Sequence, residues 1–387
     1  MGTKPREEAS AVKVVYSLSA RLGGSGIGYI AYNAVSGIYR AGLLARAFVS
    51  SNESDIPGSL VRQWGAMGRV FKYLGAKDPS GLIYHVDENL FDAWVAARLP
   101  ASDVFHGWSA MSLCSLRKAK RRGMATVVER ASSHPDNQLR LLREEYARWN
   151  VPLRVPRRNY ERTVQEFEEA DYITTPSVYA RQSLIDAGIP ERRLLNLPFG
   201  ADPKRFQPAT ARIPHPFRAI FAGQVSVRKG VPYLLEAWAR LEWFDAELWI
   251  VGGVTPDFAP LRHRWSYLNG VRFIDHTPQL ARLFQQSDVF VFPSIEEGSA
   301  LVTYEAMACG LPILTTPNAG SVARNGIDGF IVPIRDVDAL CDGLQRLRDD
   351  EALRSQMSRS ALAWASEFTW DRYRSRLLSA YEQISHH

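Results

Sequence analysis

The sequence predicts an α/β protein built from two doubly wound domains, each around a parallel sheet, and three observations support this fold class. The chain has 387 residues, and domains usually hold roughly 100–200 residues, so two domains are expected. Short β-branched apolar runs alternate with amphipathic helical stretches, as in βα units. A proline-rich segment without apolar periodicity, Ala201–Phe217, separates two series of runs and is predicted to be the linker.

The first series contains six runs that are predicted to be strands, with helices between them. They are Lys13–Ser19, Arg46–Ser50, Asp103–Trp108, Ala125–Ala131, Tyr172–Pro176 and Leu194–Gly200.

The second series is clearer, because each run stays apolar on both faces, as a parallel strand does when helices cover both sides of its sheet. The runs are Arg218–Gly223, Glu247–Gly253, Val271–Asp275, Asp288–Pro293, Pro312–Thr316 and Gly329–Val332. We therefore place one domain at residues 1–205 and the other at 206–366, followed by a last helix at 367–385 with Thr369 as its N-cap. A ligand is expected at the carboxyl ends of the strands, where the domains face each other.

Composition narrows the functional class. The chain is 46% hydrophobic and 23% charged, which excludes disordered, collagenous and coiled-coil proteins. Its apolar runs are far shorter than the roughly 18–20 residues that cross a bilayer, and the charged N-terminus lacks the apolar stretch of a secretory signal. Three cysteines without paired spacing argue against disulfides and a zinc site. A cytoplasmic protein is expected.

The strongest motif runs from Phe292 to Pro312 and reads FPSIEEGSALVTYEAMACGLP. It leaves a buried strand, passes through a turn of small residues and opens a helix that ends at Gly310. Free backbone N–H groups at the helix start suit an anion or a hydroxyl. Glu297 and Glu305 lie two helical turns apart, and such carboxylates hold vicinal sugar hydroxyls. The alternative is that Glu297 caps the helix while Glu305 is solvated.

This Glu-x7-Glu spacing, within PS-x-x-EG-x-x-L-x-x-x-EAMA-x-G-x-P, resembles the signature of family 4 glycosyltransferases, which are retaining enzymes of GT-B architecture. Further matching segments extend the resemblance over nearly all of residues 195–385. It implies two Rossmann-like domains that face each other across a cleft, with the last helix packing back on the first domain. It also implies a UDP-, GDP- or ADP-sugar as donor substrate and no separate cofactor.

Carried over residue by residue, the resemblance implies a donor site in the second domain. Glu305 would bind the ribose hydroxyls. Glu297, with the backbone at Gly298, Ser299, Ala300 and Leu301, would hold the donor sugar. The family usually has an arginine directly after Gly223 and a lysine five positions later. This sequence keeps Lys229 but has Gln224 in place of the arginine, and Arg228 would supply the missing charge.

The first domain offers weaker signals. Gly23 and Gly24 follow the first strand, where a tight turn explains them as well as a role toward the diphosphate or acceptor, which the resemblance implies. His106 matches the family histidine that contacts the donor sugar, although a lone histidine is more often structural. Arg130 and His134 would border the acceptor or the phosphates. No Asp-x-Asp pair ends a strand, so cationic side chains are expected to replace a metal ion.

Positive charge gathers in the first domain. The net charge is 47 − 41 = +6, and the stretch 111–124 holds five cations and no acid: Arg117, Lys118, Lys120, Arg121 and Arg122. Further arginines follow as far as Arg162. The alternatives are a solvated helix face and a basic surface that docks on anionic lipid. Nucleic acid is not expected as a partner, because no binding motif accompanies the charge.

The function expected from these observations is transfer of a sugar from a nucleotide-diphosphate sugar to an acceptor hydroxyl with retention. The catalytic residues would be His106, Arg228, Lys229 and Glu297, and the acceptor would be a glycan or a lipid. Front-face attack is the expected mechanism, because no residue stands out as a nucleophile. The protein would be cytoplasmic, with peripheral contact at the inner membrane face. A phosphorylase or epimerase of the same architecture and a non-catalytic nucleotide-sugar-binding protein stay open as alternatives.

Overall fold

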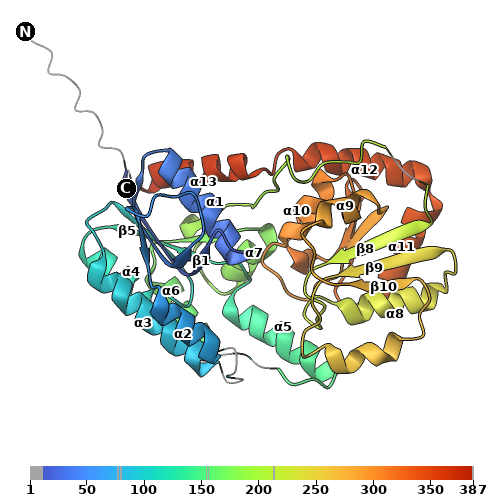
Figure 1. Cartoon of the computed structure of the whole chain (residues 1–387), viewed down its shortest axis with the longest axis horizontal. Coiled ribbons are helices and arrows are strands. Elements are labelled where there is room, and N and C mark those ends of the chain that lie inside the picture. Colours follow the sequence, from blue (N-terminus) through green and yellow to red (C-terminus); the bar gives the residue numbers. More distant parts are fainter. Residues whose placement is uncertain are drawn as a thin grey trace, which may run out of the picture. The chain divides into compact units, whose positions relative to one another are not determined.

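The protein forms two sheets flanked by helices in the computed structural model, which describes residues 12–75, 78, 81–153, 155, 157–211 and 214–385 (Figure 1). A seven-stranded sheet has the order β3-β2-β1-β4-β5-β6-β7, and a six-stranded sheet has the order β10-β9-β8-β11-β12-β13. The chain divides into two compact units. The first holds the described residues of 1–129, 156–173 and 374–387, and the second holds those of 130–155 and 174–373.

The seven-stranded sheet uses short apolar strands with helices between most of them. Its strands are β1 (Val14–Leu22), β2 (Leu44–Asn52), β3 (Val61–Gln63), β4 (Val104–Trp108), β5 (Ala125–Glu129), β6 (Tyr172–Thr175) and β7 (Leu194–Asn196). The helices of this part of the chain are α1 (Ile27–Arg40), α2 (Ala66–Gly75), α3 (Leu82–Arg98), α4 (Leu113–Arg121), α5 (Pro135–Arg148), α6 (Arg157–Glu169), α7 (Val178–Asp186) and the 3-10 segment η1 (Glu191–Arg193).

The six-stranded sheet is parallel in every adjacent pair. Its strands are β8 (Phe217–Ala222), β9 (Ala246–Val251), β10 (Val271–Ile274), β11 (Val289–Phe292), β12 (Ile313–Thr315) and β13 (Gly329–Ile331). The helices of this part of the chain are α8 (Val231–Leu241), α9 (Leu280–Gln285), α10 (Leu301–Ala308), α11 (Val337–Asp349), α12 (Glu351–Ala365), η2 (Ala259–Trp265) and η3 (Pro317–Ala319). They are followed by α13 (Trp370–Ser385), most of which belongs to the first unit.

Strand order determines where each sheet can bind a ligand. In the six-stranded sheet the chain runs outward from β8 to β10, then returns to the other side of β8 with β11. Loops that leave β8 and β11 therefore diverge, and ligands of such sheets bind in the opening at the carboxyl ends of these two strands. The loops here are 223–230 and 293–300, the two segments that the sequence predicts for the donor.

All twelve predicted strands are present, most of them shortened by a residue or two at an end. The strand β3 was not predicted. It has only three residues, and of these Val61 alone is buried, so no period-2 pattern has room to develop. The predicted N-cap is confirmed, since the Thr369 hydroxyl accepts from the Arg372 backbone N–H at 3.3 Å, just before α13. The domain division at residue 205 and the packing of the last helix stay predictions.

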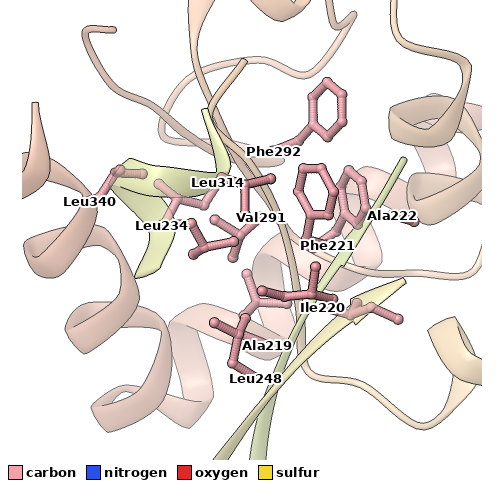
Figure 2. Packing of buried hydrophobic residues seen from close by; sticks show 14 of the residues in the cluster. Ala219, Ile220, Phe221, Ala222, Leu234, Leu248, Val291, Phe292, Leu314 and Leu340 are labelled. Atoms are coloured by element: carbon pink, nitrogen blue, oxygen red, sulfur yellow. The ribbon is translucent and has the colours of Figure 1, made fainter. Parts of the chain in front are cut away.

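The core of the second unit lies directly beneath the two loops. Figure 2 shows Phe221 at the end of β8 and Phe292 at the end of β11 with their rings side by side, and these rings stack at a centroid distance of 5.4 Å. Both side chains are almost completely buried. Because closely packed aromatic rings resist displacement, they support the two loops rigidly.

Candidate functional site

The loop from Gly223 to Gly230 connects β8 to α8 and is tied down at both ends. The Gly223 N–H donates to the Val251 carbonyl at 2.9 Å, and the Arg228 carbonyl accepts from the Ile295 N–H at 3.0 Å. Gly230 has φ +69°, and a Cβ there would lie 1.9 Å from the Pro293 carbonyl oxygen. Only glycine allows this close approach of the loop to the exit of β11.

Three of the residues predicted to bind the donor substrate lie together at these two loops. The Lys229 ammonium forms an ion pair with Glu297 Oε2, and an Arg228 guanidinium nitrogen lies 3.7 Å from the same oxygen. The Lys229 ammonium also lies 5.2 Å from the centroid of the Phe292 ring. Two cations from one loop and a carboxylate from the other therefore share one small site at the sheet's carboxyl edge.

The site is largely shielded from water. The side chains of Lys229 and Glu297 are only 10% and 15% exposed, and that of Arg228 is 26% exposed. Burial and the adjacent Arg228 lower the pKa of the Lys229 ammonium, while the Glu296 carboxylate partly offsets this shift. Charges in such a site interact more strongly than they do in water.

Glu296 is a member of this cluster that the sequence analysis did not assign. Its side chain is fully buried, and its carboxylate accepts from the Ser133 hydroxyl at 3.0 Å and the Gln138 amide at 2.9 Å. Arg228 lies 3.5 Å from the same carboxylate. Its position beside Glu297 in the motif is the only sequence signal. The structure shows that Glu296 fixes the loop before α5 and the orientation of Arg228.

The turn before α10 is held by close backbone packing. A Cβ on Gly298 would lie 1.9 Å from the Ala131 carbonyl oxygen, and the Gly298 carbonyl accepts from the Ser177 hydroxyl at 2.5 Å. The Ser299 hydroxyl lies 2.8 Å from the Tyr304 hydroxyl. The Ala300 N–H donates to the Ala319 carbonyl at 3.0 Å, so this N–H is already used within the protein.

The helix α10 itself begins without a side-chain cap, because its N-cap residue is Ala300. The N–H groups of Leu301 and Val302 therefore receive no side-chain acceptor there, which leaves them suited to a hydroxyl or an anion, whereas the Thr303 N–H donates to the Ala300 carbonyl at 3.0 Å. Glu305 lies one turn further along. Burial raises the pKa of its carboxyl group to about 7, and the positive charge of Arg205 opposes this shift. No hydrogen bond or ion pair joins this carboxylate to another side chain among the described residues.

The two residues predicted to border the acceptor have structural partners in the same unit. Arg130 donates to the Ser133 carbonyl at 3.2 Å and the Gln138 side chain at 2.8 Å. His134 is 5% exposed and caps α5, since its Nδ1 accepts from the Asp136 N–H at 3.2 Å. Burial lowers the pKa of His134. Their contact with an acceptor stays a prediction.

Gly23 and Gly24 lie in the first unit, directly after β1 and before α1. Gly23 has φ +86°, and Gly24 lines a cavity of about 440 Å³ together with Arg21, Arg69 and Glu88. Burial raises the pKa of Glu88 to about 7. The glycines therefore stand at the carboxyl end of β1, beside a cavity with both basic and acidic side chains.

His106 does not reach a surface. Its side chain on β4 is 0% exposed, its Nδ1 lies 2.6 Å from the Tyr381 hydroxyl and its Nε2 lies 3.3 Å from Glu129. Glu129 also accepts from the Tyr16 hydroxyl at 2.6 Å. A side chain enclosed in this way has no surface on which a sugar could lie. We therefore treat His106 as part of a buried network and leave it out of the catalytic set proposed below.

Some of the cations in the basic stretch at residues 111–124 form ion pairs with acids. On α4, Arg117 pairs with Glu169, and Lys120 lies 3.1 Å from Asp171. Arg162 is buried and pairs with Asp92 and Glu166, so the surface suggested up to this residue does not include it. Arg154 lies outside the described residues. Lys118 and Arg121 form no ion pair with any described acid.

The described residues contain neither a membrane-spanning helix nor a cluster of metal-binding side chains. None of the helices is both long and apolar enough to cross a bilayer. No group of three or more histidine, cysteine, aspartate and glutamate side chains within this part of the chain is arranged to hold a metal ion.

Comparisons with known proteins bear on the fold and the family. A model described as "Glycosyl transferases group 1" matches residues 216–350. The chain is 30% identical over 308 residues to the MMP alpha-(1->4)-mannosyltransferase of Mycolicibacterium hassiacum, which covers 75% of this chain and 72% of that protein. It is 31% identical over 208 residues to the D-inositol 3-phosphate glycosyltransferase of Paenarthrobacter aurescens. These residues cover 48% of this chain and only 50% of that relative.

The solved structure of Alr3699/HepE from Anabaena, in complex with UDP and glucose, matches with a TM-score of 0.70 and 17% identity over 96% of this chain and 100% of that one. The strand orders of the two sheets, together with the match to this structure, show that the protein has the GT-B fold. The relatives go further than the fold: the chain belongs to the family 4 glycosyltransferases. The fold class and the resemblance seen in the sequence are thereby confirmed.

Proposed function

We propose that this protein transfers a sugar from a nucleotide-diphosphate sugar to an acceptor hydroxyl, with retention of the anomeric configuration. The observation that carries this proposal is the cluster of Arg228, Lys229 and Glu297 beside the uncapped start of α10. The mannosyltransferase relative and the neighbour that holds UDP and glucose support the same class of substrate.

Arg228 and Lys229 would bind the diphosphate. Two cations held in a poorly hydrated site stabilise the charge that develops on a leaving diphosphate, and they do so without reorganising. In the ligand-free protein, Lys229 pairs with Glu297. A diphosphate would take over Lys229, and the released carboxylate of Glu297 would then accept hydrogen bonds from the donor sugar.

Glu305 would bind the ribose. Its carboxylate has no hydrogen-bonding side chain among the described residues, although burial raises its pKa to about 7. Two vicinal hydroxyls would supply the missing donors to its two oxygens. This binding also favours the ionised form, because hydrogen bonds to a carboxylate lower its pKa.

The chemical step would be a front-face displacement. The bond between the anomeric carbon and the diphosphate oxygen breaks, the acceptor oxygen bonds to the same face of that carbon, and the acceptor proton passes to the departing phosphate oxygen. Arg228 and Lys229 hold that oxygen's charge, and exclusion of water limits hydrolysis of the donor. NMR of the product would test retention, since an inverted anomer would contradict it.

Substitution of Glu297 tests the site. In Glu297→Ala we expect kcat for sugar transfer to fall by about 10²-fold, because a group that orients the sugar is lost. Affinity for UDP, GDP or ADP should hold or rise, since Lys229 loses a competing carboxylate. The matched control is Glu242→Ala, an exposed acid on the same unit. Undiminished turnover in Glu297→Ala would show that the site is assigned wrongly, and tight binding without any turnover in the wild type would favour a non-catalytic binding protein.

We also propose peripheral contact with an anionic membrane, with a lipid or lipid-linked glycan as acceptor. Lys118 and Arg121 on α4 support it, because neither is paired with a described acid. Each such cation contributes on the order of 1 kcal/mol at an anionic surface.

A further inference from the structure

The outward faces of α2 and α3 are apolar. Among the described residues, eight of the sixteen large hydrophobic side chains that are exposed lie within residues 67–90. Seven of them, called here the α2–α3 apolar face, are Met67 (52% exposed), Val70 (54%), Tyr73 (62%), Leu74 (44%), Leu82 (46%), Val86 (39%) and Leu90 (45%), and the eighth is Tyr84 (38%). Single exposed apolar residues are ordinary, but a contiguous set on neighbouring helices marks an interaction surface.

Helical spacing makes the face continuous. On α3, Leu82, Val86 and Leu90 follow one another at intervals of four residues, so they lie on one side of the helix. The opposite side carries Phe91 and Val95, which are completely buried, and Tyr84, which lines the cavity beside Gly24. The helix is therefore apolar toward the core and apolar toward solvent. The helices α2 and α3 pack against each other, and α4 packs against α3, as Figure 1 shows.

The acids of this segment do not face outward. Asp87 accepts from the Trp64 indole at 2.8 Å, and Glu88 accepts from the Asn159 amide at 2.6 Å. Asp92 is completely buried with Arg162, and Asp78 accepts from the Ile83 N–H at 2.9 Å.

The exposed charges around the face are positive. Arg62, Arg69 and Arg98 are exposed, and α4 adds Arg121, which is exposed and pairs with no described acid. An apolar surface that is edged by cations, and in which no described acid of residues 61–98 is exposed, is complementary to a layer of acyl chains beneath anionic headgroups. A second copy of the chain would bring the same cations against each other.

We propose that the α2–α3 apolar face docks on an anionic bilayer, with its apolar side chains entering the interface and the flanking arginines contacting lipid phosphates. The same helices line the cavity beside Gly24, through Arg69 on α2 and Tyr84 and Glu88 on α3. Docking places this cavity at the membrane surface, where the headgroup of a lipid acceptor can enter it. That last step rests on the proposed sugar transfer to a lipid acceptor, whereas the docking does not.

Vesicle binding tests the docking with the full chain. Vesicles of phosphatidylglycerol and phosphatidylcholine should bind the wild type, and vesicles of phosphatidylcholine alone should bind it much less. The triple variant V70S/L82S/L90S should bind anionic vesicles at least about tenfold more weakly, because three side chains that gain from burial are lost. The matched control is F244S/Y267S, which removes two exposed aromatic residues, 89% and 68% exposed, from the second unit.

The outcomes separate docking from catalysis. Equal vesicle binding by the triple variant and the wild type would overturn the docking proposal, as would an equal loss in the control. So would a wild-type dimer in light scattering that dissociates in the triple variant without any vesicle binding. Thermal shift with UDP, GDP and ADP reports on the nucleotide site independently. Loss of vesicle binding in the triple variant with an unchanged nucleotide shift supports docking, and vesicle binding without any nucleotide shift contradicts the proposed sugar transfer alone.

Discussion

Glu305 allows a quantitative test, because its environment couples protonation to stability. Burial raises its pKa from 4.5 to about 7. Between these values the folded chain holds a proton that the unfolded chain has released, so the free energy of unfolding falls as the pH rises. At about 1.36 kcal/mol per pKa unit, the cost reaches about 3 kcal/mol above pH 7. Glu305→Gln removes the ionisable group with little change in shape.

We therefore expect Glu305→Gln to become more stable relative to the wild type as the pH rises from about 4.5 to about 7, by up to about 3 kcal/mol. Urea unfolding of both proteins across this range measures the difference. Glu242→Gln, at an exposed acid, is the control for loss of one negative charge. A stability difference that does not change with pH would refute the reasoning about Glu305.

The affinity for nucleotide should change with pH in the opposite direction to the stability of the wild type. If the ribose hydroxyls donate to the Glu305 carboxylate, wild-type affinity for the nucleoside diphosphate should rise with pH and level off above about 7, with up to tenfold per pH unit below that. Glu305→Gln should bind about 10-fold to 100-fold more weakly and lose this pH dependence, since a charge-assisted hydrogen bond contributes roughly 1.5–3 kcal/mol. Calorimetric titration at several pH values measures both. The same variant would thus be more stable and a poorer binder.

The two other residues of the cluster give separate predictions. Lys229→Ala should weaken affinity for a nucleoside diphosphate at least about tenfold but leave affinity for the nucleoside nearly unchanged, because the ammonium serves the phosphates; equal losses in calorimetric titration would contradict this. Glu296→Ala should lower the free energy of unfolding by about 3 kcal/mol, since the buried Ser133 hydroxyl and Gln138 amide lose their acceptor. Urea unfolding measures it, and a change below about 0.5 kcal/mol would show that these contacts contribute little.

The sheets were predictable because their signal is local. Each predicted strand is an apolar run of a few residues. Such a run indicates a buried strand even when its neighbours in the sheet are unknown. Residue roles that depend on distant partners were not predictable. The burial of His106 depends on Tyr381, 275 residues further along the chain. Nothing within the local stretch around His106 indicates that its Nδ1 lies beside the Tyr381 hydroxyl.

The adjacent acids of the motif show the same limit in the site. Glu296 and Glu297 are identical in type and neighbours in sequence, yet one points to Ser133 and Gln138 and the other to Lys229. The glycine that follows them, Gly298, approaches the backbone at Ala131 closely, a contact between segments far apart in the chain. Motif spacing could identify the site, but only the fold distinguishes the fixed carboxylate from the one that a ligand can release.

This distinction explains how a buried cluster of charges can be stable without ligand and still bind one. Arg228 and Lys229 face Glu296 and Glu297, so the formal charges balance, and no unpaired ion is left in a poorly hydrated site. Glu296 has other donors and need not move, whereas the partners of Glu297 among the described residues are the two cations. A diphosphate that binds Lys229 takes the place of the Glu297 carboxylate. Lys229 therefore keeps an anionic partner throughout and is never a buried charge without one. The exchange leaves Glu297 in need of hydrogen-bond donors, and the hydroxyls of the attached sugar meet that need.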